Sequence, residues 1–155
     1  MVQQNKDEIY FHFLTNPFFF PKRKELKSYL RSLFKKEGKA VEQINYIFCT
    51  DEYLLSLNKT HLKHDTYTDI ITFELSPKGE ALVADIYIST ERVKENAQTF
   101  QTPFQKELHR VIFHGALHLC GYKDKTKQQS QLMRTKEEEN LSRYFVPRGT
   151  KKPGL

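Results

Sequence analysis

Two histidines four residues apart are the strongest chemical signal in the chain, within the segment ELHRVIFHGALHLCGYKD at positions 107–124. Because a helix turns by about 100° per residue, side chains at positions i and i+4 share a face, with Cβ atoms roughly 5–6 Å apart. His114 and His118 could therefore bind one metal ion, each through one imidazole nitrogen. The spacing predicts a metal-binding helix.

A third ligand is predicted six residues after the second histidine. Gly121 is typical of a helix end and lets the chain reverse, which would return the Asp124 carboxylate to the same ion. Three protein ligands leave one tetrahedral position open, as in catalytic rather than structural zinc sites. We therefore expect one zinc ion per chain, with a metal-bound water held by His114, His118 and Asp124 as the catalytic group.

Each of these residues also has a structural interpretation, which the sequence leaves open. The two histidines could be hydrogen-bonded core residues, and either Asp124 or Thr126 could cap the last helix. His109 is expected on another face of the helix, away from the metal. Gly115 stands where a zinc protease of the HExxH design carries its general base, so peptide hydrolysis of that design is disfavoured.

Three further carboxylates are candidates for a supporting role. Asp69 and Asp85 are predicted on neighbouring strands, where a carboxylate among apolar residues is costly unless it is hydrogen-bonded. They could order a ligand histidine or satisfy backbone groups, and the sequence favours neither interpretation. Glu107 shares the histidine stripe two turns earlier, where we expect a surface group or a group behind the ligands.

The elements that must position these residues alternate between strand and helix. Apolar β-branched runs and helical periodicity predict strands at 9–14, 44–49, 68–75 and 81–89, and helices at 22–37, 51–62, 91–100, 103–120 and 127–145. The turn SPKG predicts a hairpin between the last two strands. We therefore predict an α+β fold, with a mixed, partly antiparallel sheet of about four strands flanked by helices.

The histidine-bearing helix is apolar around much of its circumference, which predicts a central, buried, metal-binding helix. Asp51 and Thr90 are the expected N-caps of the second and third helices. Cys49 and Cys120 lie in apolar runs and are expected to be buried, reduced thiols. No CxxC spacing occurs in the sequence, so a zinc ribbon is excluded.

The length of 155 residues predicts a single domain, residues 1–147, followed by a basic flexible tail at 148–155. A net charge of +6 favours a polyanionic partner such as nucleic acid. The sequence shows neither a signal peptide nor a membrane-spanning run, so we expect a cytoplasmic protein with no membrane partner. The first helix is rich in basic residues: Lys22, Arg23, Lys24, Lys27, Arg31, Lys35 and Lys36.

Three motifs resemble those of the YbeY family of endoribonucleases, the rRNA maturation factors. The segment 114–122, HGALHLCGY, resembles the family signature HGxLHLxGYDH. Asn58 followed by TDIITF at 68–73 resembles the family's N and T-[DN]-V-L-S-F, and ADIYIS at 84–89 resembles its GDIxIS strand. The motifs stand in the family's order and cover most of residues 54–124.

This resemblance implies a zinc-dependent hydrolase specific for single-stranded RNA. It also implies roles in 16S rRNA 3′-end maturation and in ribosome quality control, with the 16S rRNA precursor and the ribosome as partners. A different class remains open, in which the protein is a ribosome-associated assembly factor with a structural metal. An enzyme should lose RNA cleavage but keep RNA binding when His114 becomes Ala, whereas an assembly factor should lose neither.

The chain departs from the family pattern at two positions. The family usually has His where this chain has Asp124. A carboxylate also binds zinc, but its negative charge makes bound water less acidic and shifts the metal preference toward iron or manganese. The family also usually has Arg where this chain has Leu62, which leaves phosphate stabilisation unassigned. Neighbouring Lys63 is the candidate substrate contact.

Overall fold

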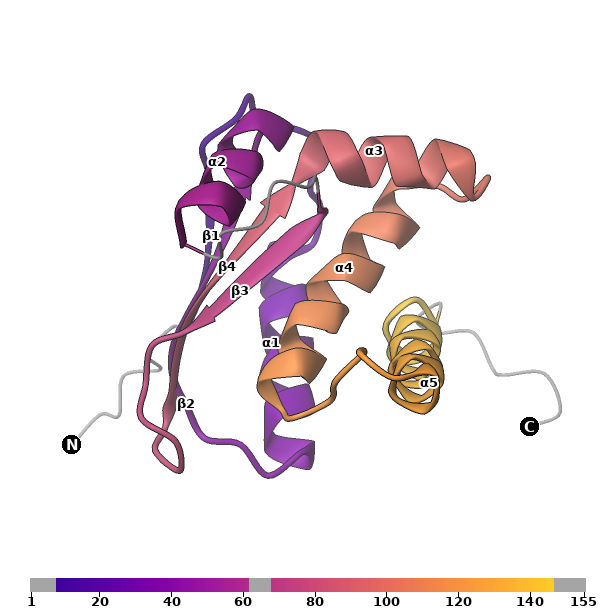
Figure 1. Cartoon of the computed structure of the whole chain (residues 1–155). Helices are drawn as coiled ribbons and strands as arrows, with labels where there is room; N and C mark the ends of the chain where they lie inside the picture. Colours follow the sequence, from indigo (N-terminus) through magenta and orange to yellow (C-terminus); the bar gives the residue numbers. More distant parts are fainter. Residues whose placement is uncertain (1–7, 62–67, 147–155) are drawn as a thin grey trace, which may run out of the picture.

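The computed structural model describes residues 8–61 and 68–146 of the chain. Leu62, Lys63 and the predicted tail at 148–155 therefore lie outside the described residues, as does the predicted domain boundary. The elements, labelled in Figure 1, are β1 (Ile9–Phe13), α1 (Arg23–Lys36), β2 (Val41–Cys49), α2 (Asp51–His61), β3 (Ile70–Glu74), β4 (Leu82–Ser89), α3 (Thr90–Thr99), α4 (Phe104–Leu119) and α5 (Lys127–Tyr144).

The four strands form one mixed sheet in the order β1-β2-β4-β3. The β1–β2 and β2–β4 pairs are parallel, whereas β3 and β4 form the antiparallel hairpin that the turn residues predict. Gly79 in that turn has φ 89°, a left-handed conformation that favours glycine. The predicted fold class, a mixed and partly antiparallel sheet flanked by helices, is confirmed.

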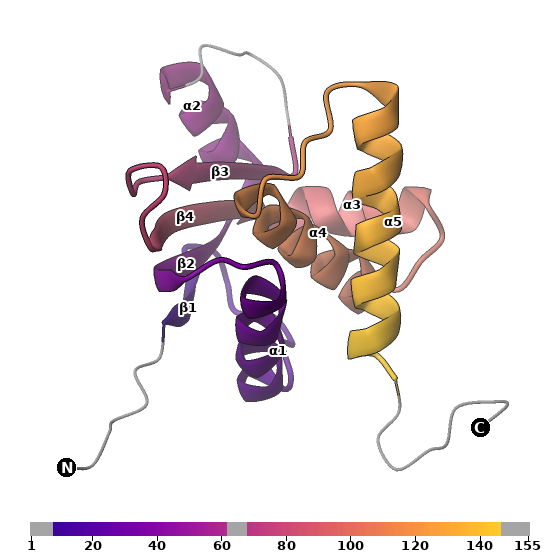
Figure 2. The ribbon, with the colours of Figure 1, turned by 90° about the horizontal axis from the view of Figure 1, so that it is seen from below.

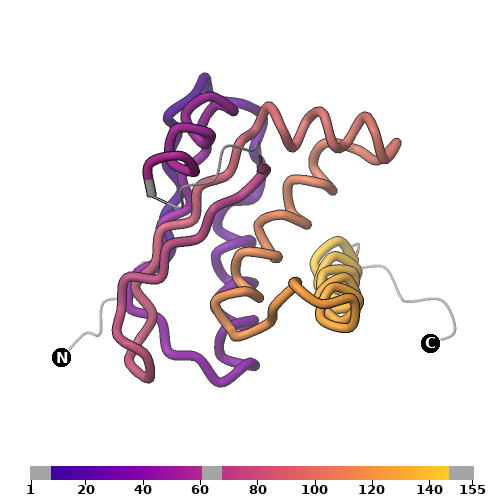
Figure 3. Tube along the Cα trace, in the orientation of Figure 1, coloured from indigo at the N-terminus to yellow at the C-terminus, as the bar shows by residue number. Residues whose placement is uncertain are grey.

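The helices cover the two faces of the sheet unequally. On β4, Ile86 and Ile88 face the main core with α1 and α4, while Tyr87 faces α2 on the other side. Helix α5 packs against α4 on the side away from the sheet (Figures 1 and 2). The trace in Figure 3 shows the short connection that links the end of α4 to α5.

Helix α4 is the centre of the core, as its apolar circumference predicts. The Tyr46 hydroxyl donates a hydrogen bond of 2.8 Å to the Ile112 carbonyl, which fastens the helix to β2. Glycine allows a close approach at position 115, because a Cβ there would lie 3.0 Å from Ile70 Cδ1 and 3.1 Å from Ile86 Cγ2. The histidine-bearing segment is therefore held tightly against β3 and β4.

Two predicted helix caps differ from the structure by one residue. Thr50 Oγ1 accepts from the Tyr53 amide at 3.1 Å, so Thr50 rather than Asp51 caps α2. The Asp51 carboxylate instead binds Arg92 at 2.7 Å. Ser89 rather than Thr90 caps α3, because its hydroxyl accepts from the Arg92 amide at 3.1 Å. In both cases the side chain of the hydroxyl residue one position earlier reaches the free amide of the first turn, and Ser89 has the extended backbone of a cap.

Two remaining features are the burial of the cysteines and the apolar length of the helices. Cys49 is buried and Cys120 is half-buried, and both are free thiols. Within the described residues, no helix is long and apolar enough to cross a membrane.

Candidate metal centre

One stripe of polar side chains runs along α4, spaced three or four residues apart. It consists of Glu107, Arg110, His114 and His118. Glu107 is buried, His114 is partly buried and His118 is exposed, so the stripe leads from the core to the surface. Of the two positions expected for Glu107, the structure shows the one behind the ligands, because its buried carboxylate accepts from Arg110 at 2.6 Å.

His114 stands between two carboxylates. Its Nδ1 lies 2.6 Å from Glu137 Oε2, and its Nε2 lies 3.5 Å from Asp124 Oδ2. Burial alone would raise the pKa of Glu137, but the His114 hydrogen bond and the positive charge of Arg110 outweigh it and hold that pKa below its ordinary value. An ionised Glu137 can only accept, so Nδ1 donates this hydrogen bond and Nε2 is the ring nitrogen that faces Asp124.

Asp124 comes from the loop that Gly121 starts, with φ 105° at that glycine. Two donor atoms about 2.0–2.1 Å from one tetrahedral ion lie roughly 3.3 Å apart, close to the separation between His114 Nε2 and the Asp124 carboxylate. Thr126 caps α5, since its hydroxyl accepts from the Gln129 amide at 3.1 Å in a complete capping box. Capping is thus not the role of Asp124.

His118 lies one turn beyond His114 on the same face of α4. Its Nδ1 is 3.2 Å from the Tyr122 carbonyl, which leaves Nε2 as the nitrogen for a ligand. The Tyr122 hydroxyl donates to the carboxylate of Glu37, the C-cap residue of α1, at 3.1 and 3.2 Å. The loop that orients His118 is therefore anchored to another helix.

The donor set fits a transition metal, because two imidazoles and one carboxylate are ligands that zinc, iron and manganese accept. The side chains are only partly gathered. Across residues 8–61 and 68–146, no three His, Cys, Asp or Glu side chains are grouped closely enough to hold an ion. The structure brings His114 and Asp124 together and leaves His118 outside that pair.

A network of buried charged side chains holds Glu137, the hydrogen-bond partner of His114 Nδ1. The Arg110 guanidinium makes two bonds to Glu107, of 2.6 and 2.9 Å, and one of 3.0 Å to Glu137. It also lies 3.8 Å from Asp69 of the segment before β3. Burial lowers the pKa of Arg110, but Glu107 and Glu137 more than reverse this and raise it above its ordinary value. Arg110 therefore stays charged, and the carboxylates around it outnumber it.

Arg110 and Glu137 are not among the site residues predicted from the sequence, although the helical spacing marks each of them. Arg110 stands four residues before His114 inside an apolar helix, which places it on the histidine stripe. Glu137 is one of three consecutive glutamates, but it alone falls on the apolar row of α5, between Met133 and Leu141. A charged residue at a core position of a helix is a candidate for a buried ion pair.

Asp69, Asp85 and His109, which the sequence also singles out, lie in different parts of the fold. Asp69 lies beside Arg110, and burial raises the pKa of its carboxyl. Asp85 accepts from Asn45 Nδ2 at 3.1 Å. Because its neighbour Ile86 faces α4, Asp85 points to the opposite face of the sheet and away from the histidines. His109 stacks on Tyr144, with ring centroids 5.2 Å apart, on the other side of α4.

Comparison with known proteins gives consistent matches over most of the chain. The family model described as Endoribonuclease YbeY matches residues 20–145. The chain is 48% identical over 141 residues to Endoribonuclease YbeY of Christiangramia forsetii, covering 91% of this chain and 97% of that protein. It is 50% identical over 119 residues to the protein of the same name from Flavobacterium psychrophilum, covering 77% and 84% of the two chains. The solution structure of TM1509 from Thermotoga maritima aligns with a TM-score of 0.59 and 28% identity, over 95% of this chain and 99% of that one.

Proposed function

The chain belongs to the family of the endoribonuclease YbeY, and we propose that it cleaves single-stranded RNA with one zinc ion held by His114, His118 and Asp124. Family membership supports a hydrolytic nuclease that processes rRNA. The proposed substrate is the 3′ end of the 16S rRNA precursor, in maturation and in ribosome quality control. The ribosome is the proposed partner, and the cytoplasm the proposed compartment.

The arrangement of His114 carries this proposal. One ring nitrogen is held by a buried carboxylate, and the other faces a second, partly exposed carboxylate. Metal-binding histidines commonly donate their second ring N–H to a carboxylate or a backbone carbonyl, which fixes the tautomer and the ring orientation. In this chain, Nδ1 of His114 is bonded to the Glu137 carboxylate, and Nδ1 of His118 to the Tyr122 carbonyl.

The residues of the chain have distinct tasks in this mechanism. Glu137 holds the Nδ1 proton of His114, and Arg110 keeps Glu137 ionised. The Tyr122 carbonyl orients His118 in the same way. A bound ion would act as a Lewis acid on a phosphate oxygen and lower the pKa of water. Asp124, with 46% of its side chain exposed, lies where substrate can approach.

Two lysines next to Asp124 supply positive charge for phosphate binding. Lys123 and Lys125 flank it in the loop, and both side chains are exposed. Positive charges beside the ligands favour the approach of a polyanion and help to hold its phosphates. We propose them as phosphate contacts, in a chain that has Leu62 where the family usually has Arg.

The test compares RNA cleavage and RNA binding by the same purified samples. The substrate is a single-stranded RNA with the 3′ end of the 16S rRNA precursor, and the same RNA annealed to its complement is the second substrate. The parent should cut only the single strand, while His114→Ala and Asp124→Asn should lose cleavage and keep binding. His12→Ala is the matched control, because His12 lies exposed on β1 and should cleave like the parent.

Two results would count against the proposed function. Cleavage that persists in both His114→Ala and Asp124→Asn would contradict the proposal. Specific RNA or ribosome binding without cleavage in any sample, including the parent supplied with zinc, iron or manganese, would instead favour the assembly factor with a structural metal. The basic surface of α1 suits that role.

A further inference from the structure

A second concave surface lies on the other side of α4, between the start of α1 and the end of α5. This groove has a volume of about 830 Å³. The yellow end of α5 lies on the same side of the molecule as α1 in Figure 2. The residues of the lining used below are Lys22, Glu25, Gln105, His109, Arg143, Tyr144 and Phe145.

The groove is separate from the metal centre. His109, which lines it, is five residues before His114 on α4. Five residues at about 100° each place the two side chains about 140° apart around the helix. A ligand in this groove would therefore not touch the proposed metal ligands, and its effect can be measured independently of them.

Aromatic rings give the groove a preformed stacking surface. Phe145 is 45% exposed and packs edge-on against His109 and Tyr144, with ring centroids 5.0 Å apart in both pairs. His109 and Tyr144 are themselves stacked, with an interplanar angle of 22°. A ring held in place by neighbours offers a face to a nucleobase, as in many proteins that bind single-stranded nucleic acid.

Cations stand on both walls of the groove. Lys22 lies just before α1 and Arg143 in the last turn of α5, and both side chains are exposed. Glu25 is the single acidic residue among the described residues that line the groove. Burial lowers the pKa of His109, so its ring is neutral at pH 7 and serves as a stacking group. The charge on the walls suits a phosphate next to a stacked base.

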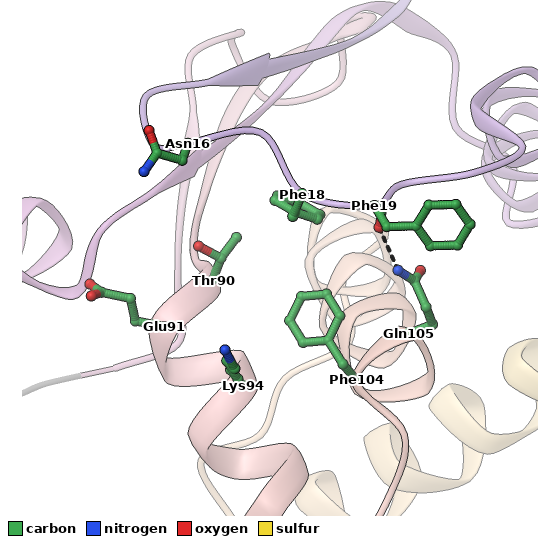
Figure 4. Close-up of a pocket in the computed structure, with 8 residues that line it drawn as sticks. All are labelled: Asn16, Phe18, Phe19, Thr90, Glu91, Lys94, Phe104 and Gln105. Carbon is green, nitrogen blue, oxygen red and sulfur yellow. Dashed lines mark hydrogen bonds between the residues drawn. The ribbon is translucent and has the colours of Figure 1, made fainter.

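Gln105 adds a polar side chain to the lining of the groove. Its Nε2 donates to the Phe19 carbonyl at 2.6 Å, as Figure 4 shows. Its Oε1 is buried and has no hydrogen-bond partner among the described residues. Buried acceptors are normally paired, and the amino group of a bound nucleobase would supply a donor if the Gln105 side chain turned to meet it.

We propose that this groove binds one unpaired nucleotide of an RNA strand, with the base on Phe145 and the phosphate between Lys22 and Arg143. The inference rests on the proposed function, since it gives the RNA substrate a second contact remote from the metal centre. Stacking selects single strands, because the bases of a duplex are not available to a ring. The phosphate contacts add affinity without distinguishing the two forms.

The test measures binding of a fluorescent single-stranded oligoribonucleotide by anisotropy, with the full chain carrying His118→Ala so that the RNA stays intact. In this background, Phe145→Leu keeps the apolar bulk and removes the ring. We expect it to weaken binding by about tenfold, the effect of losing one stacked base. Phe100→Leu is the matched control, since Phe100 is 61% exposed outside the groove, and it should bind within twofold of its background.

A second variant tests the phosphate contact separately. Arg143→Gln should weaken binding and reduce the slope of log affinity against log salt by about 0.7, the value for one phosphate contact on a single strand. Arg134→Gln, exposed on the same helix, is its control. Arg143 is exposed, so its replacement should leave the fold intact, which circular dichroism checks. This variant therefore decides the outcome even if Phe145→Leu proves unstable.

The results separate this inference from the proposed function. If Phe145→Leu and Arg143→Gln bind RNA like their controls, the groove does not hold RNA and the inference is overturned, whatever the cleavage assay shows. If both weaken binding while the parent cuts no RNA, the groove is confirmed and the nuclease proposal fails.

Discussion

Glu137 of α5 and His114 of α4 share a hydrogen bond of 2.6 Å, from His114 Nδ1 to Glu137 Oε2. This bond makes the packing of α5 part of the proposed metal site, because the helix supplies the group that sets the histidine tautomer. Helix α5 also carries its own anchors in the core, Met133 and Leu141, on either side of Glu137 in the sequence. Changes in α5 should therefore reach metal binding through this one contact.

Glu137→Gln should lower metal affinity about 10- to 100-fold, the range typical for loss of the carboxylate behind a metal-binding histidine. The amide can still bond to Nδ1 but carries no charge to make the ring more basic. Competition with a chromophoric chelator measures the affinity, and circular dichroism checks the fold. Glu138→Gln, at the exposed neighbouring position, is the control. Equal affinities for the two variants would refute the role given to Glu137.

Arg110→Met should destabilise the fold by about 3–5 kcal/mol, because it leaves Glu107 and Glu137 buried without their cation. Urea unfolding followed by circular dichroism gives the free energy of unfolding. Arg134→Met, exposed on α5, should change it by less than about 0.5 kcal/mol. Adding Glu107→Gln to Arg110→Met should restore part of the loss, and a strictly additive double variant would argue against the network.

Gly115→Ala should destabilise the protein by about 1 kcal/mol, even though alanine is the better helix former. The new methyl group would lie 3.0 Å from Ile70 Cδ1 and 3.1 Å from Ile86 Cγ2, so α4 or the sheet must shift. The Ile70 methyl can rotate away, whereas Ile86 Cγ2 is fixed to a branched carbon in the core. A rise in the urea midpoint would mean that helix propensity outweighs the close contact.

The two thiols should be unreactive in the native protein. Burial, helped by the charge of Asp51, raises the pKa of Cys49 to about 12, and burial with Glu37 raises that of Cys120 to about 12. At pH 8 the thiolate fraction then falls on the order of a thousandfold below that of an ordinary cysteine. Iodoacetamide labelling followed by mass spectrometry should be slow in buffer and fast in guanidinium. Fast labelling of either cysteine in buffer would contradict this.

The raised pKa values of the two thiols also make the stability of the fold depend on pH. A thiol whose pKa is higher in the folded state stabilises that state fully below its ordinary pKa. This contribution is lost as the pH rises from the ordinary value toward the folded value of about 12. The urea midpoint should thus fall between about pH 9 and pH 12, and replacing Cys49 with Ala should reduce that fall.

Much of the fold could be predicted because its signals are local. The apolar alternation of β4 and the turn before it indicate the hairpin, and the apolar circumference of α4 indicates its central position. The observed N-caps lie one residue before the expected ones, because Thr50 and Asp51, like Ser89 and Thr90, are neighbouring residues that both favour caps. The side chain that reaches the amide depends on the backbone angle at the start of the helix, which composition does not specify.

The site was less predictable because its support comes from residues far apart in the sequence. The pairing of His114 with His118 follows from helical spacing, and Gly121 indicates the turn toward Asp124. The contact between Glu137 and His114 joins residues 23 positions apart, and no local pattern identifies it. Asp85 shows the converse, since its polar character is conspicuous but its strand register points it to the opposite face of the sheet.

Metal analysis of the purified, untagged protein tests the central claim most directly. Mass spectrometry should find close to one zinc, iron or manganese ion per chain in the parent. The ion should be lost in His118→Ala and in Asp124→Ala, while circular dichroism remains native. A folded parent that contains no metal, and takes up none when zinc, iron and manganese are offered, would contradict the account.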